Sequence, residues 1–234
     1  MPFPNYDPIY LLIIGVAMIA SRLAGAQLQR KFALYSQVPM PVSGRQVAQQ
    51  MLAENGIRDV EVTSTRGQLT DHYNPRGRTV NLSEPVYAAH SVAAAAVAAH
   101  ECGHAVQHAR NYPMLGLRSN LVPVVQLGSQ LAPWVLIAGL GLAVAGNNLT
   151  VLLIGIILFA STTLFALITL PVEFDASRRA LAWLEKSGVA TGLSHKQAKD
   201  ALFWAAMTYT IAALASLGQL FYYIMLFLQV RNRR

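Results

Sequence analysis

Long apolar blocks without charge alternate along this chain with shorter stretches that carry most of its polar side chains. Residues 9–26 are apolar at all but two positions, and residues 121–146, 149–170 and 201–230 contain no charged side chain. Each block can cross the hydrocarbon core of a bilayer, which needs about 20 residues of helix. The last block either crosses once with tilt or folds back as a kinked hairpin near residues 216–218. The pattern predicts a mainly α membrane protein with about four hydrophobic helices.

Between the first and second apolar blocks the pattern is mixed and predicts a small α+β domain at the membrane surface. Ser43 and Gln46 have the spacing of a capping box that opens a helix. Residues 60–63 alternate as a strand, and residues 69–73 and 78–82 flank a turn, which predicts a β-hairpin. Two roles fit this hairpin: its exposed edge pairs with an extended substrate, or it only packs against the next helix.

That next helix carries the most informative motif. Residues 93–110 are rich in helix formers and contain His100, Glu101 and His104. At about 100° per residue, the histidines lie one turn apart on one face, and Glu101 lies beside them. Two imidazoles at this spacing bind Zn²⁺ in hydrolases, and the offset carboxylate reaches a water rather than the metal. Cys102 falls on the far side. The alternative is an exposed helix with ordinary polar histidines, but the alanine-rich start indicates a buried helix, in which these groups need a partner.

A catalytic zinc site usually has three protein ligands, so a third is expected elsewhere in the chain. Glu173 follows the third apolar block, at the membrane boundary from which the zinc-motif helix leads into the second block. A membrane hairpin would therefore bring the two elements to one depth. The alternative role for Glu173 is an acid in the first turn of a helix that begins at Pro171, where the helix dipole favours it.

The sequence also predicts roles for two neighbours of Glu173. Asp175 faces away from Glu173 and is expected to pair with Arg178 or Arg179. Ser177 lies one turn beyond Glu173, and it either orients a ligand by a hydrogen bond or is a plain surface serine.

The remaining candidates are single residues. His108 lies about 12 Å along the helix axis from His100, too far to share an ion, so a supporting or structural role is expected. Tyr209 is a candidate stabiliser of a developing oxyanion, although a boundary tyrosine also fits an aromatic belt. Three histidines without ligand spacing are expected to be ordinary polar residues: His72, His90 and His195.

The distribution of charge predicts the orientation in the membrane. Basic residues gather after the first apolar block, before the second and after the third. By the positive-inside rule this face is cytoplasmic, which leaves the N-terminus and residues 146–148 outside. Arg231, Arg233 and Arg234 break the pattern if the last block crosses once. The N-terminus lacks the basic start of a cleavable signal peptide.

The composition and charge of the chain indicate which kind of partner it binds. The chain has 234 residues, of which 54% are hydrophobic and 12% charged, with a formal charge of +7. Because the basic residues lie at membrane boundaries, the expected partner is the lipid bilayer with its anionic head groups and not a nucleic acid. The lone Cys102 excludes an intramolecular disulfide and a zinc site built on several cysteines.

Four motifs together resemble the YugP-type neutral zinc metallopeptidases, small bacterial membrane proteins of the gluzincin group. They are residues 69–76, 80–83, 98–107 and 170–179. The resemblance spans nearly the whole chain and implies a zincin-like metallopeptidase domain. It also implies one Zn²⁺ bound by His100, His104 and Glu173, with Glu101 as general base and a peptide or protein as substrate.

Two departures from the family pattern stand out. Cys102 occupies a position where valine is common, and Ser177 occupies one where many gluzincins have an aspartate. The group that orients His100 or His104 is therefore not identified from the sequence.

The expected organisation has five segments. They are an N-terminal membrane helix (1–31), a surface domain with a small sheet and the zinc-motif helix (32–118), a transmembrane hairpin (119–170), a third-ligand helix with a cytoplasmic segment (171–200), and a C-terminal hydrophobic helix or kinked hairpin with a basic tail (201–234).

The expected function is a zinc-dependent endopeptidase of the bacterial cytoplasmic membrane, with its site at the cytoplasmic boundary. Zinc would activate a water, and Glu101 would take its proton. The alternatives are an intramembrane protease of the site-2 type, a prenyl-protein protease, and a non-catalytic membrane scaffold stabilised by zinc. The sequence leaves the substrate and the oligomeric state open.

Overall fold

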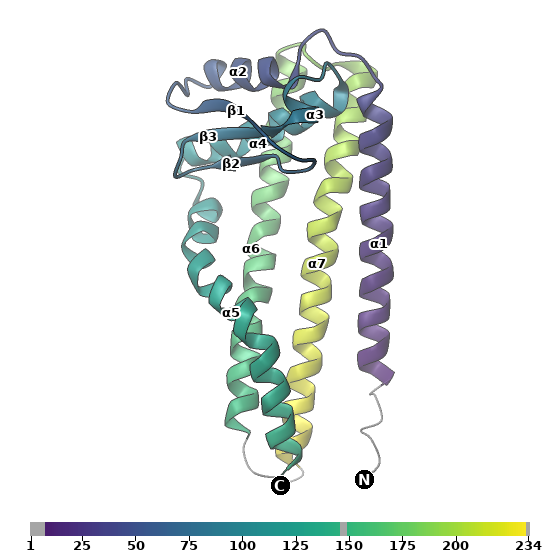
Figure 1. The fold of residues 1–234 in the computed structure, drawn as a ribbon, viewed down its shortest axis with the longest axis vertical. Coiled ribbons are helices and arrows are strands. Elements are labelled where there is room, and N and C mark those ends of the chain that lie inside the picture. Colours follow the sequence, from purple (N-terminus) through teal and green to yellow (C-terminus); the bar gives the residue numbers. More distant parts are fainter. Residues whose placement is uncertain (1–7, 146–148, 233–234) are drawn as a thin grey trace. The chain divides into compact units, whose positions relative to one another are not determined.

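The computed structural model describes residues 8–145 and 149–232, and its secondary structure is mainly helical (Figure 1). The helices are α1 (Pro8–Ser36), α2 (Gly44–Glu54), α3 (Glu84–Tyr87), α4 (Val92–Ala109), α5 (Pro113–Val144), α6 (Thr150–Lys186) and α7 (Gly192–Asn232). The strands are β1 (Glu61–Thr65), β2 (His72–Asn74) and β3 (Thr79–Ser83). Helices α1, α5, α6 and α7 are long and apolar enough to cross a membrane. The predicted mainly α fold with four hydrophobic helices and a small sheet is confirmed.

The chain divides into two compact units. The first comprises Met1–Arg22, Leu117–Leu170 and Tyr209–Arg234, and the second comprises Leu23–Gly116 and Pro171–Thr208. The first unit therefore holds most of the apolar helical segments. The second holds the sheet, α2, α3, α4 and the polar ends of the long helices.

Helix α2 begins as its sequence predicts. The Ser43 hydroxyl accepts a hydrogen bond from the Gln46 amide at 3.3 Å, and the Gln46 side chain accepts one from the Ser43 amide at 2.8 Å. This reciprocal capping box satisfies two amide groups that a helix start leaves free. The apolar face of α2 is buried in a core shared with α4, with Val47 and Met51 at its centre.

The sheet has the strand order β1-β3-β2. Strands β2 and β3 are antiparallel, with Tyr73 opposite Val80, and form the predicted hairpin. Its turn is held by the Asn74 side chain, which accepts hydrogen bonds from the amides of Arg76 and Gly77 at 3.0 Å each. Strand β1 pairs parallel to β3, so β2 is left as an edge strand.

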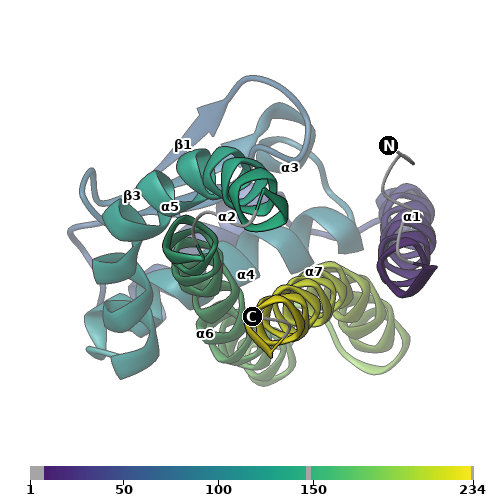
Figure 2. The ribbon, with the colours of Figure 1, turned by 90° about the horizontal axis from the view of Figure 1, so that it is seen from below.

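In the first unit, α5 and α6 pack closely, and α7 packs beside them (Figure 2). A Cβ added at Gly139 of α5 would lie 2.5 Å from the Leu152 Cα of α6, so this crossing requires glycine. Leu136 and Ile156 are buried in the same cluster, which also packs against Tyr223 of α7.

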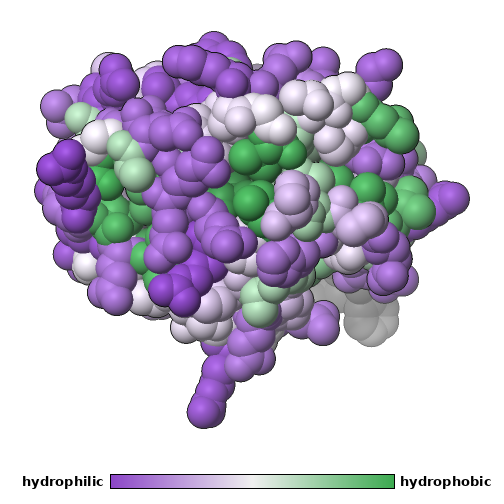
Figure 3. Space-filling model, turned by 90° about the horizontal axis from the view of Figure 1, so that it is seen from above, coloured by the Kyte–Doolittle hydropathy of each residue, from purple (hydrophilic) through white to green (hydrophobic). Residues whose placement is uncertain are grey.

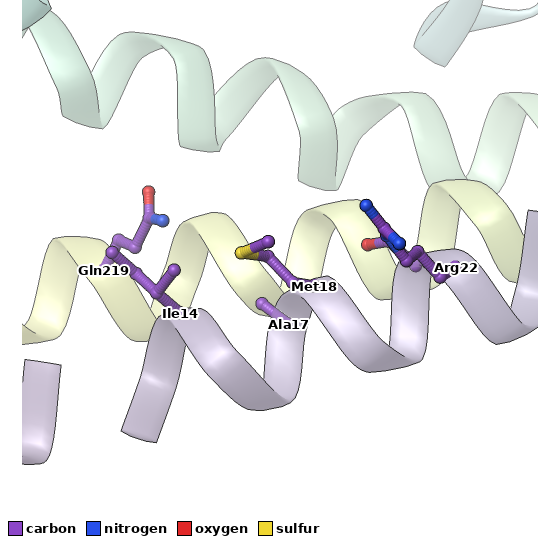
Figure 4. Close-up of a pocket in the computed structure, with 6 residues that line it drawn as sticks. Ile14, Ala17, Met18, Arg22 and Gln219 are labelled. Atoms are coloured by element: carbon purple, nitrogen blue, oxygen red, sulfur yellow. The ribbon is translucent and has the colours of Figure 1, made fainter. Parts of the chain in front are cut away.

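Helix α1 lies along α7 and buries little of its surface. The hydroxyls of Tyr10 and Tyr223 are 3.4 Å apart, and a pocket opens between the two helices (Figure 4). Arg22 and Gln219 line this pocket among the apolar side chains of α1. Most of the apolar residues of α1 are exposed, as expected for a helix that faces lipid.

Figure 3 shows the hydropathy of the surface when the molecule is seen from above. Hydrophilic side chains cover most of that face, and hydrophobic side chains form separate patches between them (Figure 3).

Two expectations are corrected. Helix α7 is continuous from Gly192 to Asn232, so the predicted alternative of a hairpin near residues 216–218 is wrong. Helix α6 continues through Pro171, so Glu173 is not an acid at a helix start. A proline inside a helix removes one backbone hydrogen bond, a loss that the rest of a long apolar helix tolerates.

Residues 146–148, Arg233 and Arg234, on which part of the orientation prediction rests, lie outside the described residues.

Candidate metal centre

Helix α4 holds the zinc motif inside the core of the second unit. The Ser91 hydroxyl caps its start by accepting a hydrogen bond from the Ala94 amide at 3.2 Å. Nearly all of its residues are buried, including Glu101, His104 and Gln107. The alanines along its first half let neighbouring elements approach its backbone from several sides. The expected buried helix is confirmed, and the alternative of an exposed helix is wrong.

Helix α6 crosses α4 at the motif. A Cβ added at Gly103 would lie 2.6 Å from the Ala176 carbonyl oxygen, so only glycine allows this approach. The close contact places the stretch of α6 after Pro171 against the histidine-bearing face of α4. Glu173 lies on this stretch.

The three predicted ligands meet at this crossing. The Glu173 carboxylate oxygen Oε2 lies 3.3 Å from His100 Nε2 and 3.7 Å from His104 Nε2. One ligand atom from each residue lies within 4.8 Å of the others. The side chains are 13%, 10% and 5% exposed for His100, His104 and Glu173, respectively.

This donor set fits zinc. Ligand atoms about 2.0–2.1 Å from a tetrahedral Zn²⁺ lie about 3.3 Å apart, close to the separations between Glu173 and the two histidines. Two imidazole nitrogens and one carboxylate oxygen are also the donors of many catalytic zinc sites, which keep a fourth position open. The three residues can therefore hold one zinc ion.

Glu101 lies beside this group and is tied to the edge strand. Its Oε2 accepts a hydrogen bond from the Tyr73 backbone N–H at 3.0 Å, and the side chains of the described residues offer it no further hydrogen bond. In an antiparallel pair, alternate residues direct their N–H groups away from the partner strand. Because the Tyr73 N–H points to Glu101, the free edge of β2 faces the motif.

The charges of the site alter the pKa of His104. Burial disfavours the imidazolium, but the hydrogen bond to Glu173 and the charges of Glu101 and Glu173 outweigh it, so the pKa of His104 is raised above its usual 6.5. In the metal-free protein this histidine holds its proton more tightly than an isolated one.

Each ligand histidine has a second hydrogen-bond partner on its other ring nitrogen. The Ser177 hydroxyl lies 3.1 Å from His100 Nδ1, and the Gln107 side-chain oxygen lies 3.0 Å from His104 Nδ1. Asp175 pairs with both Arg178 and Arg179, which confirms its expected partners. The role of Gln107 was not foreseen, although its position three residues after His104 places it on the same helix face.

His108 contacts Tyr73 instead of the metal ligands. The Tyr73 hydroxyl lies 2.7 Å from His108 Nδ1, and burial raises the pKa of Tyr73, which keeps the phenol protonated. This contact ties α4 to β2 and agrees with the expected supporting role.

Tyr209 belongs to the other unit and is 42% exposed, so its role as an oxyanion stabiliser stays a prediction.

Comparison with known proteins shows to which family this chain belongs. The family described as "Putative neutral zinc metallopeptidase" matches residues 10–228. "Putative membrane protease YugP" of Bacillus subtilis (strain 168) is 39% identical over 226 residues, which cover 96% of this chain and 99% of that protein. No solved structure matches the chain significantly. The resemblance inferred from the four sequence motifs is confirmed, and the chain belongs to the neutral zinc metallopeptidase family.

Proposed function

We propose that this protein is a zinc-dependent endopeptidase of the gluzincin type, embedded in the bacterial cytoplasmic membrane. The observation that supports this most strongly is the convergence of two imidazoles and one carboxylate from α4 and α6 at zinc-ligand separations, with Glu101 beside them. Family membership adds independent support for zinc and for peptide hydrolysis.

His100, His104 and Glu173 would hold one zinc ion. When bound, zinc supplies a Lewis acid that polarises the scissile carbonyl and lowers the pKa of a water. Glu101 takes the proton of this water and delivers it to the leaving amine. The Tyr73 N–H fixes one oxygen of the Glu101 carboxylate at 3.0 Å and leaves the other oxygen for the proton.

The substrate would bind in an extended form along β2. This strand is an edge of the sheet, and its free side faces Glu101 through the Tyr73 N–H. Backbone pairing with such an edge orients a peptide independently of most of its side chains. It would also favour unstructured segments, because most backbone groups of a folded chain are already hydrogen-bonded.

The site would lie at the cytoplasmic membrane boundary. Glu173 follows the uncharged part of α6 by three residues within the same continuous helix, and several basic residues come after it. Helix α4 is not among the helices of the described chain that are long and apolar enough to span a membrane. This favours a boundary site over an intramembrane protease of the site-2 type.

The test compares bound zinc and proteolysis in wild type, Glu101→Gln and Glu173→Ala. The purified full-length proteins in detergent are assayed for metal content and for cleavage of an unstructured reporter protein. We expect about one zinc per chain in wild type and Glu101→Gln, and less in Glu173→Ala. Cleavage by Glu101→Gln should fall by about 10²–10⁴-fold, because general-base catalysis contributes that much.

Each other outcome rejects a defined part of the proposal. Full zinc content in Glu173→Ala would remove Glu173 from the site. Retention of more than about a tenth of the activity in Glu101→Gln would rule out Glu101 as the base. Zinc bound without cleavage of any reporter by wild type would favour a non-catalytic scaffold.

A further inference from the structure

His104 can bind a metal through Nε2 only if its proton is on Nδ1. The side chain that contacts Nδ1 therefore decides whether the correct tautomer is present before the metal arrives. That side chain is Gln107, whose Oε1 lies 3.0 Å from Nδ1. Gln107 is completely buried, so no water competes for this contact.

The orientation of the Gln107 amide follows from its other end. Its Nε2 lies 2.8 Å from the Val172 carbonyl oxygen and 2.9 Å from Asp175 Oδ2. Both partners are acceptors, so the amide NH₂ must be on this side. The amide oxygen then faces His104, and Nδ1 of His104 must be the donor.

Asp175 is itself held in place by charge. Its side chain is 4% exposed, and it pairs with Arg178 and with the Arg179 Nε, the latter at 2.6 Å. A carboxylate held by two guanidinium groups remains ionised and remains an acceptor. The contacts thus form a chain from the arginines through Asp175 and Gln107 to His104.

His100 is oriented separately. Its Nδ1 contacts the Ser177 hydroxyl at 3.1 Å, and neither Gln107 nor Asp175 takes part in this contact. The two histidines therefore have independent supports, His100 from a side chain of α6 and His104 from a side chain of α4.

We propose that Gln107 is a positioning residue that holds His104 as its Nδ1–H tautomer with Nε2 directed at Glu173, and that Asp175 acts on metal binding through Gln107. This inference rests on the proposed zinc site. It assigns the orienting role for His104 to an amide on α4 and a carboxylate on α6, neither of which was a candidate for that role from the sequence.

The test is a double-mutant cycle on zinc affinity. The zinc dissociation constant of the full-length protein is measured by competition with a chromophoric chelator for wild type, Gln107→Met, Asp175→Asn and the double variant. A second cycle replaces Asp175→Asn with Ser177→Ala. Thermal unfolding of each metal-free protein reports on stability separately.

The matched control is Trp183→Phe on α6. It removes a partly buried hydrogen bond of 2.7 Å from Trp183 Nε1 to Glu54 and touches none of the proposed ligands. It should change unfolding but leave the zinc dissociation constant within about threefold of wild type, since only changes next to a metal's ligands lower its affinity by more.

We expect Gln107→Met to raise the zinc dissociation constant by about 10–100-fold. Asp175→Asn should raise it less, and it should add almost nothing once Gln107 is replaced, because its path to His104 is gone. The effects of Gln107→Met and Ser177→Ala should multiply, because they act on different histidines. If Gln107→Met does not fold, Gln107→Asn serves instead, since its shorter amide cannot reach both His104 and Asp175.

The contrary outcomes separate the two proposals. If wild type binds zinc and Gln107→Met or Gln107→Asn binds it within about threefold as tightly, the positioning role is wrong and the zinc site stands. Effects of Gln107→Met and Asp175→Asn that multiply would overturn the action of Asp175 through Gln107. Failure of wild type to bind zinc would instead reject the proposed function.

Discussion

The two histidine ligands and the base of the proposed zinc site are each supported by a different kind of neighbour. His100 has a hydroxyl, His104 has an amide, and Glu101 has a backbone N–H from the edge strand. The spacing of His100, Glu101 and His104 was readable from the sequence because it is a property of one helix turn. Their supports were not fixed by this spacing, because the Ser177 hydroxyl comes from α6, the Tyr73 N–H comes from β2, and the Gln107 amide is oriented by its contacts with α6.

At the residue scale, the raised pKa of His104 predicts how zinc binding depends on pH. Zinc needs a neutral imidazole, so protons compete with it below the pKa of this histidine. Because that pKa is raised above 6.5 in the metal-free protein, proton competition at this histidine should already halve the zinc affinity at a pH above 6.5 as the pH is lowered. Chelator competition at a series of pH values measures this. An affinity that is halved only below pH 6.5 would contradict the prediction.

At the scale of elements, the crossing of α4 and α6 decides whether a site exists. Pro171 is compatible with a helix start, but α6 continues through it, and the same helix carries Glu173 to the histidines. Composition could not show this continuity. It depends on the packing of the polar end of α6 against α4, where Gly103 contacts Ala176.

The replacement Gly103→Ala tests the crossing. The added Cβ would lie 2.6 Å from the Ala176 carbonyl oxygen, so α6 must shift and carry Glu173 away from the histidines. We expect a destabilisation of about 1–3 kcal/mol, as for overpacked cores, together with weaker zinc binding. Thermal unfolding and zinc titration measure the two effects.

The matched control for this prediction is Gly116→Ala on α5. A Cβ at Gly116 meets nothing within 4 Å, and alanine favours a helix over glycine by about 0.5–1 kcal/mol. This variant should be as stable as wild type or more stable, with unchanged zinc binding. Equal behaviour of the two variants would show that the close approach at Gly103 does not matter.

At the scale of the whole molecule, the distribution of charge predicts which side of the membrane each end of the long helices faces. The uneven distribution of lysine and arginine predicts the N-terminus outside and the metal centre on the cytoplasmic side. Because α7 is one continuous helix, a single crossing places Arg231 on the outer side against this rule. The orientation is therefore a proposal that labelling can decide.

Single cysteines test this orientation in intact cells. Cys102 is completely buried and burial raises its thiol pKa, so the native protein should not react with a membrane-impermeant maleimide. Ala145→Cys should be labelled from outside, and Lys196→Cys only after the membrane is permeabilised. The reverse pattern would place the metal centre outside the cell.

The sequence by itself determined the features that depend on local periodicity. These are the four apolar helices, the capping box, the hairpin, and the two histidines with Glu101 on a buried helix, because each is set by side chains within a few turns of one element. Only the tertiary structure decided what surrounds the motif. The contacts of Gln107 with Val172 and Asp175 join residues 65 and 68 positions apart, and packing, not spacing along the chain, brings such residues together.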